Sequence, residues 1–207
     1  MVVIVDYGMG NIGSVLNALM AIGTPAVVSQ DAEDILQAEK LLLPGVGAFG
    51  DGMESLRRLG LVSVLEEAVM RKRTPILGIC LGMQLFADSS SEFGENKGLG
   101  WIPGRVERIR PSDGTLKIPH VGWNSVAWRS RSPLMEGITQ DPTFYFVHSY
   151  QFHATDNADV VGVCDYGGEI AAVVQRDNIF GVQFHPEKSQ SDGLAILKNF
   201  IRLQCNA

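Results

Sequence analysis

One cysteine lies in a setting that suits nucleophilic chemistry. The segment Gly78-Ile79-Cys80-Leu81-Gly82 follows an apolar run that predicts a strand and precedes a run that predicts a helix. Glycine on both sides of the nucleophile is typical of a nucleophile elbow, because larger side chains would collide with backbone in so sharp a turn. A cysteine at a helix N-terminus also lies near free N–H groups, which favour thiolate over thiol. The pattern predicts that Cys80 is a reactive nucleophile.

A histidine and a carboxylate follow a second apolar run, Ile179 to Phe184. His185 and Glu187 are two residues apart, so in extended backbone their side chains project to the same side, and Pro186 restricts the backbone between them. The carboxylate can then orient the imidazole ring toward the nucleophile. The sequence therefore predicts a catalytic triad of Cys80, His185 and Glu187.

Two glycine-rich segments match the dinucleotide-binding pattern G-x-G-x-x-G, namely Gly8 to Gly13 and Gly45 to Gly50. Two matches in one short chain indicate how unspecific the pattern is, so a nucleotide-binding module is the weaker alternative. Glycines in the second segment instead allow backbone N–H groups to approach a developing oxyanion. We expect Val46 or Gly47 to supply one donor of an oxyanion hole, and Leu81, next after the nucleophile, to supply the other.

The elements that must position these residues alternate along the first half of the chain. Strands are predicted over Val2 to Asp6, Ala26 to Ser29, Lys40 to Leu43 and Pro75 to Cys80, and helices over Asn11 to Ile22, Met53 to Arg73 with a break near Gly60, and Leu81 to Ala87. The alternation predicts a mostly parallel central sheet with helices on both faces. After Val106 helical periodicity is scarce until Leu194 to Leu203, so a smaller antiparallel portion is expected in the C-terminal half. We expect one α/β domain over residues 1–207.

Composition limits the class of protein. The chain has 207 residues and a net charge of −6, and its Lys and Arg residues are scattered, which argues against a nucleic-acid or anionic-membrane surface. The apolar start, Met1 to Val5, lacks a basic leader and is far shorter than the roughly 20 residues of a membrane span. A cytoplasmic protein whose partners are proteins and small molecules is therefore expected.

The other cysteines and histidines are interpreted as bystanders. Cys164 and Cys205 are far apart and form no CxxC pair, so free thiols are expected. His120, His148 and His153 have no comparable partner nearby in the sequence. The four histidines also lack the spacing of metal ligands, so neither a metal nor a cofactor is expected.

With these motifs in this order, the chain resembles the triad-type glutamine amidotransferases, which carry the G-x-C-x-G elbow, a downstream His-Pro-Glu and an upstream Pro-Gly loop. Within that family it is similar to the glutaminase subunits of imidazole glycerol phosphate synthases. The segments that carry this likeness are Asp6 to Asn11, Pro44 to Gly47, Gly78 to Gln84, His120 to Asn124, Tyr145 to Tyr150 and Gln183 to Ser189.

The resemblance implies that Cys80, His185 and Glu187 hydrolyse glutamine to glutamate and ammonia. It implies that the ammonia passes to a (βα) barrel subunit that makes imidazole glycerol phosphate in histidine biosynthesis, and it leaves open a related barrel partner in a surface-sugar amidation pathway. The residues implied to hold glutamine are Gly45, Gly47, Gln84, Glu92, Ser149 and Tyr150. Those implied to face the barrel partner are Asn11, Trp123 and Tyr145.

Overall fold

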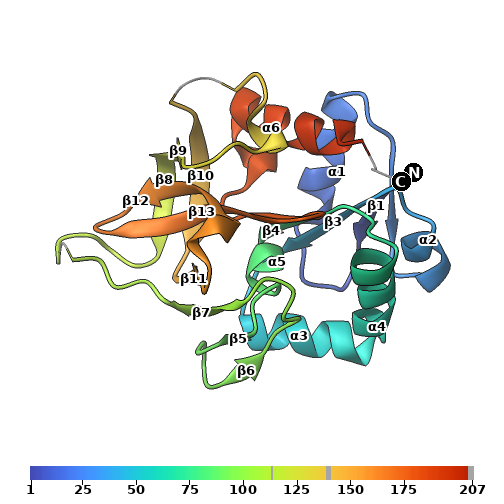
Figure 1. Ribbon diagram of the computed structural model, residues 1–207, viewed down its shortest axis with the longest axis horizontal. Helices are drawn as coiled ribbons and strands as arrows, with labels where there is room; N and C mark the ends of the chain where they lie inside the picture. The colour runs from blue at the N-terminus through green and yellow to red at the C-terminus, as the bar shows by residue number, and fades with distance from the viewer. Residues whose placement is uncertain (113, 139–140, 205–207) are drawn as a thin grey trace.

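The fold is built around an eight-stranded sheet (Figure 1). The computed structural model describes residues 1–112, 114–138 and 141–204, so Cys205 lies outside the described residues. In spatial order the strands are β2 (Ala26–Ser29), β1 (Val2–Val5), β3 (Lys40–Gly45), β4 (Ile76–Cys80), β14 (Ile179–Val182), β13 (Glu169–Arg176), β12 (Val160–Asp165) and β9 (Ala127–Trp128). Neighbours are parallel from β2 to β14 and antiparallel from β14 to β9. The predicted α/β fold with a mostly parallel sheet is confirmed.

Helices cover both faces of this sheet. One face carries α1 (Ile12–Ala21) and α6 (Gln190–Arg202), and the other carries α2 (Ala32–Leu36), α3 (Phe49–Arg58) and α4 (Leu61–Glu66), which continues into a π-helical turn, η1 (Glu67–Arg71) (Figure 1). Successive strand residues point to opposite faces. Ile4 therefore packs in the core beneath α1 and α6, whereas Val3 and Val5 pack in the core beneath α2, α3 and α4. Burial on both faces explains the continuous apolar runs of the sequence.

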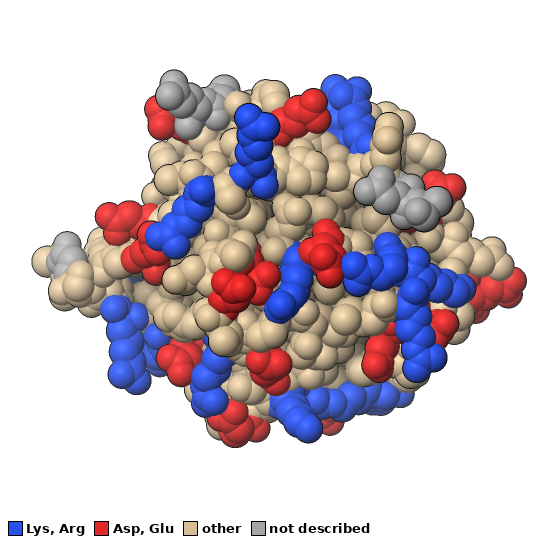
Figure 2. Space-filling model, viewed as in Figure 1, with Lys and Arg blue, Asp and Glu red and all other residues tan. Residues whose placement is uncertain are grey.

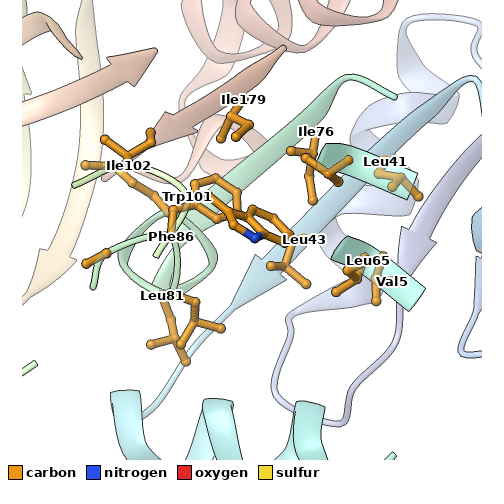
Figure 3. Close-up of a cluster of buried hydrophobic side chains, with 14 of the residues drawn as sticks. Val5, Leu41, Leu43, Leu65, Ile76, Leu81, Phe86, Trp101, Ile102 and Ile179 are labelled. Atoms are coloured by element: carbon orange, nitrogen blue, oxygen red, sulfur yellow. The ribbon is translucent and has the colours of Figure 1, made fainter. Parts of the chain in front are cut away.

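The core beneath α2, α3 and α4 holds in place the chain segment that follows β4. Phe86 and Trp101 stack with ring centroids 5.4 Å apart, and they lie among side chains of β3 and β4 such as Leu43 and Ile76 (Figure 3). A Cβ atom added to Gly78 would come within 2.6 Å of the Phe86 ring. The packing therefore holds the end of β4 in place.

Three predicted helices differ from those observed. The closing helix, predicted over Leu194 to Leu203, begins earlier and is α6 (Gln190–Arg202). The stretch predicted as Met53 to Arg73 begins earlier, at Phe49, and is interrupted as expected at Gly60, which has φ +70°. The helix after the elbow, α5 (Leu81–Gln84), is a single turn that ends before Ala87. The chain tightens there, since the N–H of Ala87 donates to the carbonyl of Gln84 three residues back at 3.0 Å.

Smaller sheets occupy the C-terminal half. A two-stranded ribbon pairs β8 (His120–Ser125) with β10 (Thr143–His148), and a four-stranded sheet has the order β11 (Tyr150–Ala154), β7 (Gly104–Arg108), β5 (Ser89–Ser90) and β6 (Asn96–Lys97). Short 3₁₀ turns are η2 (Pro133–Met135), η3 (Asn157–Asp159) and η4 (Pro186–Lys188). Ser149 alone separates β10 from β11, so the two small sheets meet at this residue.

The surface carries charges of both signs. On the face shown in Figure 2, Lys and Arg residues are interspersed with Asp and Glu residues, and some Lys and Arg side chains lie together at the right of the view. Within the described ranges, no helix combines the length and apolar character needed to cross a bilayer.

Candidate active site

The ends of neighbouring strands bring the predicted residues to one edge of the central sheet. Gly45 at the end of β3 lies opposite Cys80 at the end of β4, and β14 on the other side of β4 runs parallel to it and ends shortly before His185. The carboxyl ends of parallel strands are where α/β proteins place their ligands. A cavity of about 420 Å³ opens there. It is lined by Val46, Gly47, Cys80, Leu81, Gln84, Glu92, Pro119, Val147, His148, Ser149, Tyr150 and His185.

The backbone at Cys80 is strained in the manner of an elbow. Cys80 has φ 54° and ψ −108°, a conformation that residues with a side chain rarely adopt. A Cβ atom on Gly82 would collide with the carbonyl oxygen of Leu43, and one on Gly78 would lie 2.6 Å from the Met83 nitrogen. The surrounding backbone therefore requires glycine at both flanks. Because α5 is only one turn long, the helix dipole at Cys80 is small.

His185 and Glu187 form a buried pair. The Nδ1 atom of His185 lies 2.8 Å from Oε1 of Glu187, and their side chains are 2% and 1% exposed. Since a carboxylate accepts, Nδ1 carries the proton and donates. The prediction of extended backbone from His185 to Glu187 is wrong, because His185 leads into the 3₁₀ turn η4 and Glu187 lies within that turn. The predicted contact forms by a different backbone route.

Two neighbours set the charge of His185. Burial lowers the pKa of its imidazole, but the Cys80 thiol and the Glu187 carboxylate outweigh burial and raise the pKa to about 9. The Nε2 atom is buried and has no full hydrogen-bond partner among the described residues. At neutral pH the ring therefore holds its second proton beside Cys80, where it favours negative charge on the sulfur.

One of the N–H groups predicted as oxyanion donors, that of Val46, already makes a hydrogen bond in this structure. The N–H of Val46 donates to the carbonyl oxygen of Met9 at 2.6 Å, and the Val46 side chain is 42% exposed. Gly47 follows with φ +106°, and a Cβ atom there would lie 2.9 Å from the end of the Met9 side chain. Leu81 lines the cavity beside the nucleophile. In this state the Val46 N–H is committed to Met9 and not to an oxyanion.

Gln84 lines the cavity, and the nitrogen of its side-chain amide is engaged by two neighbours. Its Nε2 atom donates to the carbonyl oxygen of Tyr150 at 3.1 Å and to Oε1 of Gln183 at 2.9 Å. An amide nitrogen has two hydrogens, so both are used. Gln84 thus offers a ligand only its oxygen.

Glu92, Ser149 and Gly45 have different surroundings. One oxygen of Glu92 accepts from the N–H of Phe49 at 2.7 Å, so this carboxylate caps α3 while it lines the cavity. Burial raises the pKa of Glu92. Ser149 lines the cavity beside Tyr150. Gly45 lies just behind, and a Cβ atom there would collide with the Tyr7 hydroxyl, which explains a glycine at this strand end.

Gln183 is a residue of this site that the sequence reasoning missed. It is fully buried, and its Nε2 atom lies 3.6 Å from the sulfur of Cys80. The signal that could have found it is its position directly after β14 and two residues before His185.

His120 and His148, which have no comparable partner nearby in the sequence, contact each other in the fold. Nδ1 of His148 lies 2.8 Å from the Tyr150 carbonyl, and Nε2 of His148 lies 3.1 Å from Nδ1 of His120. A carbonyl accepts, so His148 donates through Nδ1 and accepts from His120 through Nε2. Burial lowers the pKa of each ring to about 4, so both are neutral near pH 7. The partners are paired across β8 and β10 and are 28 residues apart, which local sequence does not reveal.

The three residues expected at a partner surface lie outside this cavity. Trp123 is 48% exposed and contacts Tyr145 edge-on across the ribbon, with centroids 6.2 Å apart. Val121 and Val147 are also exposed and form the neighbouring cross-strand pair. Asn11 is half-buried just before α1, and its side-chain oxygen accepts from the Ser14 hydroxyl at 3.0 Å.

The glycine loop before α1 does not have the packing of a dinucleotide site. In that fingerprint the third glycine allows close contact between helix and strand. A Cβ atom on Gly13 would have no neighbour within 4 Å. Among the described residues, no group of three or more His, Cys, Asp or Glu side chains is arranged to hold a metal ion.

Comparisons with known proteins agree with this geometry. The family model for class-I glutamine amidotransferases matches residues 3–203. A HisH 2 subunit of imidazole glycerol phosphate synthase from Pseudomonas aeruginosa is 50% identical, over 98% of this chain and 100% of that protein. The HisH subunit from Sulfurimonas denitrificans is 48% identical over 98% of each chain.

Solved structures match the fold at low sequence identity. A crystal structure of a glutamine amidotransferase has a TM-score of 0.75 at 19% identity and covers 97% of both chains. PurLQS from Thermotoga maritima has a TM-score of 0.72 at 19% identity and covers 97% of this chain and 96% of that chain. The chain belongs to the class-I glutamine amidotransferase family and, within it, to the HisH group.

Proposed function

We propose that this chain is the glutaminase subunit of an imidazole glycerol phosphate synthase. It hydrolyses glutamine with Cys80, His185 and Glu187 and supplies ammonia to a (βα) barrel subunit in the cytoplasm. The observation that carries the proposal is the buried His185–Glu187 pair beside a cysteine held in a strained elbow. The high identity to HisH subunits supports histidine biosynthesis over a surface-sugar pathway.

The reaction follows from the positions of these groups. The Cys80 sulfur attacks the side-chain carboxamide carbon of glutamine, and the carbonyl oxygen becomes an oxyanion that backbone N–H groups stabilise. His185 gives its Nε2 proton to the departing nitrogen, which leaves as ammonia, and a thioester remains. His185 then takes a proton from water, which attacks the thioester, and glutamate leaves as Cys80 is regenerated. No metal or cofactor takes part in this scheme.

Glutamine is held by the wall opposite the loop. Because both hydrogens on Gln84 Nε2 are used, its oxygen accepts a hydrogen bond from the α-ammonium group of glutamine. Ser149 and Tyr150 extend this wall, and Glu92 adds negative charge on the same side when it is ionised. Gly45 and Gly47 belong to the loop on the other side of the substrate, where a Cβ atom would meet the Tyr7 hydroxyl and the end of the Met9 side chain.

The barrel partner docks on the exposed ribbon. Val121, Trp123, Tyr145 and Val147 expose apolar area next to the cavity, since Val147 also lines it. Aromatic side chains are enriched at protein interfaces. Asn11 follows the Met9 segment that holds the loop, and we assign it to the same interface. A partner at this surface covers the cavity, so ammonia leaves into the partner and not into solvent.

Docking also completes the oxyanion hole. The N–H of Val46 is bound to Met9 in the isolated chain. Rotation of the Gly45–Val46 peptide, which the flanking glycines permit, releases this N–H toward the cavity. Loss of one oxyanion donor costs on the order of 10² to 10³ in rate. The isolated subunit is therefore expected to be a poor glutaminase.

The division of labour between the subunits is tested with Cys80→Ala in the reconstituted complex. We expect synthesis from glutamine to be abolished and synthesis from ammonium salts to be unchanged, because the acceptor chemistry belongs to the partner. Cys164→Ala is the matched control, since Cys164 is buried in β12 and lies outside the cavity. Equal loss of both activities in Cys80→Ala contradicts the proposal.

The pathway is tested with the partner's acceptor. The complex is expected to release imidazole glycerol phosphate when it receives glutamine and the phosphorylated ribose-linked acceptor of that reaction. Aminated sugar in place of that product would assign the chain to the alternative pathway.

A further inference from the structure

We propose that Gln183 is a hydrogen-bond donor to the catalytic sulfur, which it holds in place and stabilises as the thiolate. The inference rests on the proposed role of Cys80 as the nucleophile. Gln183 Nε2 lies 3.6 Å from Sγ of Cys80, within the range for a hydrogen bond to sulfur, and the side chain of Gln183 has no solvent exposure. The triad does not include this contact.

The orientation of the Gln183 amide is fixed by a chain of neighbours. The Tyr150 carbonyl can only accept, so the Gln84 atom next to it at 3.1 Å is the nitrogen. That same nitrogen donates to the nearest atom of Gln183 at 2.9 Å, which must therefore be the oxygen. The Gln183 nitrogen is left to face Cys80. A main-chain carbonyl thus determines which end of a side chain meets the sulfur.

The sulfur has a chemical need for such a donor. A buried thiolate is costly unless groups nearby donate to it or carry positive charge. The helix behind Cys80 is one turn long and contributes little. The titratable groups around the sulfur are His185, whose pKa the thiol raises, and the buried Tyr7, whose pKa is also raised by burial and by Cys80. His148 lies next to His185 and is neutral near pH 7. Gln183 therefore supplies an N–H that stays in place at any pH.

The chain of amides also links substrate to nucleophile. Gln84 is the residue whose oxygen is assigned to the glutamine α-ammonium group, and its nitrogen holds Gln183. Both amides are buried, so neither rotates freely. Placement of the substrate and placement of the sulfur thus depend on the same pair of side chains.

The test measures alkylation of Cys80 by iodoacetamide as a function of pH in the full-length chain, with mass spectrometry to separate Cys80 from Cys164. In Gln183→Met, which keeps the length but has no N–H, we expect the midpoint of the Cys80 profile to rise by about one pH unit. In Gln183→Glu, which keeps an acceptor for Gln84 and adds negative charge, we expect a larger rise. Gln175→Met in β13 is the matched control and leaves the midpoint unchanged.

Steady-state glutaminase kinetics of the complex provide a second readout. We expect Gln183→Met to lower kcat about tenfold and to raise KM as well, because the substitution removes both the N–H at the sulfur and the oxygen that accepts from Gln84. Gln183→Glu provides the comparison if Gln183→Met does not fold. A folded variant with an unchanged midpoint, or with a raised KM and normal kcat, overturns the role of Gln183. Wild-type Cys80 that reacts no faster than Cys164 overturns the proposed function instead, so the two failures are distinguishable.

Discussion

The two walls of the cavity are built in opposite ways. The fixed wall consists of Cys80, Gln84, His148 and His185, which are each buried and held by side-chain or backbone contacts. The loop wall consists of Val46 and Gly47, where one backbone hydrogen bond to Met9 holds a residue that is nearly half exposed. Cys80 ends β4 and the loop wall follows β3, and these two strands are adjacent and pair in register.

The contrast separates two requirements of the reaction. A nucleophile and its base must hold their geometry, because an error of about 1 Å costs roughly a hundredfold in rate. Under the proposed mechanism, the Val46 N–H is needed as an oxyanion donor only when ammonia has a destination. A donor on the loop wall, separate from the buried nucleophile, then controls the reaction without disturbing the residues that perform it.

The largest effect is expected on the fixed wall. His185→Asn should remove nearly all glutaminase activity of the complex, by a factor of about 10⁴ or more, because it removes the proton donor. Glu187→Gln should leave a measurable remainder, since an orienting residue contributes less than the base that it orients. Turnover of both variants in the presence of the partner checks the ranking. Equal losses would mean that Glu187 does more than orient the ring.

The loop wall should show the next largest effect. The isolated chain is expected to hydrolyse glutamine about 10² to 10³ times more slowly than the complex with acceptor ligand bound, because the Val46 N–H is engaged with Met9. Steady-state turnover is measured for the chain alone, with partner, and with partner and ligand. Full activity of the chain alone would contradict the idea that the loop wall limits the reaction until the partner binds.

Glycine substitutions in the two walls should lower the free energy of unfolding by different amounts. Gly82→Ala places a Cβ atom against the Leu43 carbonyl, and we expect a loss of about 3 kcal/mol of unfolding free energy, or roughly 6 to 12 °C in Tm. In Gly47→Ala the Cβ atom meets only the flexible end of Met9, so the main cost is the strain at φ +106°, of order 1 kcal/mol. Thermal unfolding measures both. A larger Tm loss in Gly47→Ala would contradict the assignment of the rigid wall.

The smallest effect is expected in the dependence of stability on pH. Burial lowers the pKa values of His120 and His148 from 6.5 to about 4, so the unfolded chain binds protons at a higher pH than the folded chain. Their contribution to stability is complete above about pH 6.5 and is lost as the pH falls toward 4. Tm should fall over this window, and His148→Gln should reduce the slope. His153→Gln, on an exposed strand position, is the control and should leave the slope unchanged.

Much of the fixed wall could be predicted, because local sequence patterns mark its residues. The elbow was readable because Gly78 and Gly82 flank Cys80 between two recognisable elements, and the α/β fold was readable from alternating apolar runs. The position of His185 beside Glu187 was likewise encoded within three residues.

Contacts between distant segments were less predictable. The His120–His148 hydrogen bond depends on the register of β8 and β10, and the Gln84–Gln183 pair joins residues 99 positions apart. The orientation of the Val46 N–H could not be predicted either, because glycine accepts a wide range of backbone angles and the local sequence does not select one of them. The short α5 ended early because the chain turns there to pack Phe86 against Trp101, a tertiary effect that overrides helical periodicity.

The hydrogen bond between Val46 and Met9 is made by main-chain atoms alone, and this has a consequence for how the sequence can drift. Any residue at position 9 presents the same carbonyl, and any residue at position 46 except proline presents the same N–H. Substitutions at these two sites can therefore accumulate without releasing the loop, provided that the backbone keeps its path. If this hydrogen bond restrains hydrolysis as proposed, the restraint is robust to mutation at these two positions, and its response to a partner depends on the side chains around the loop.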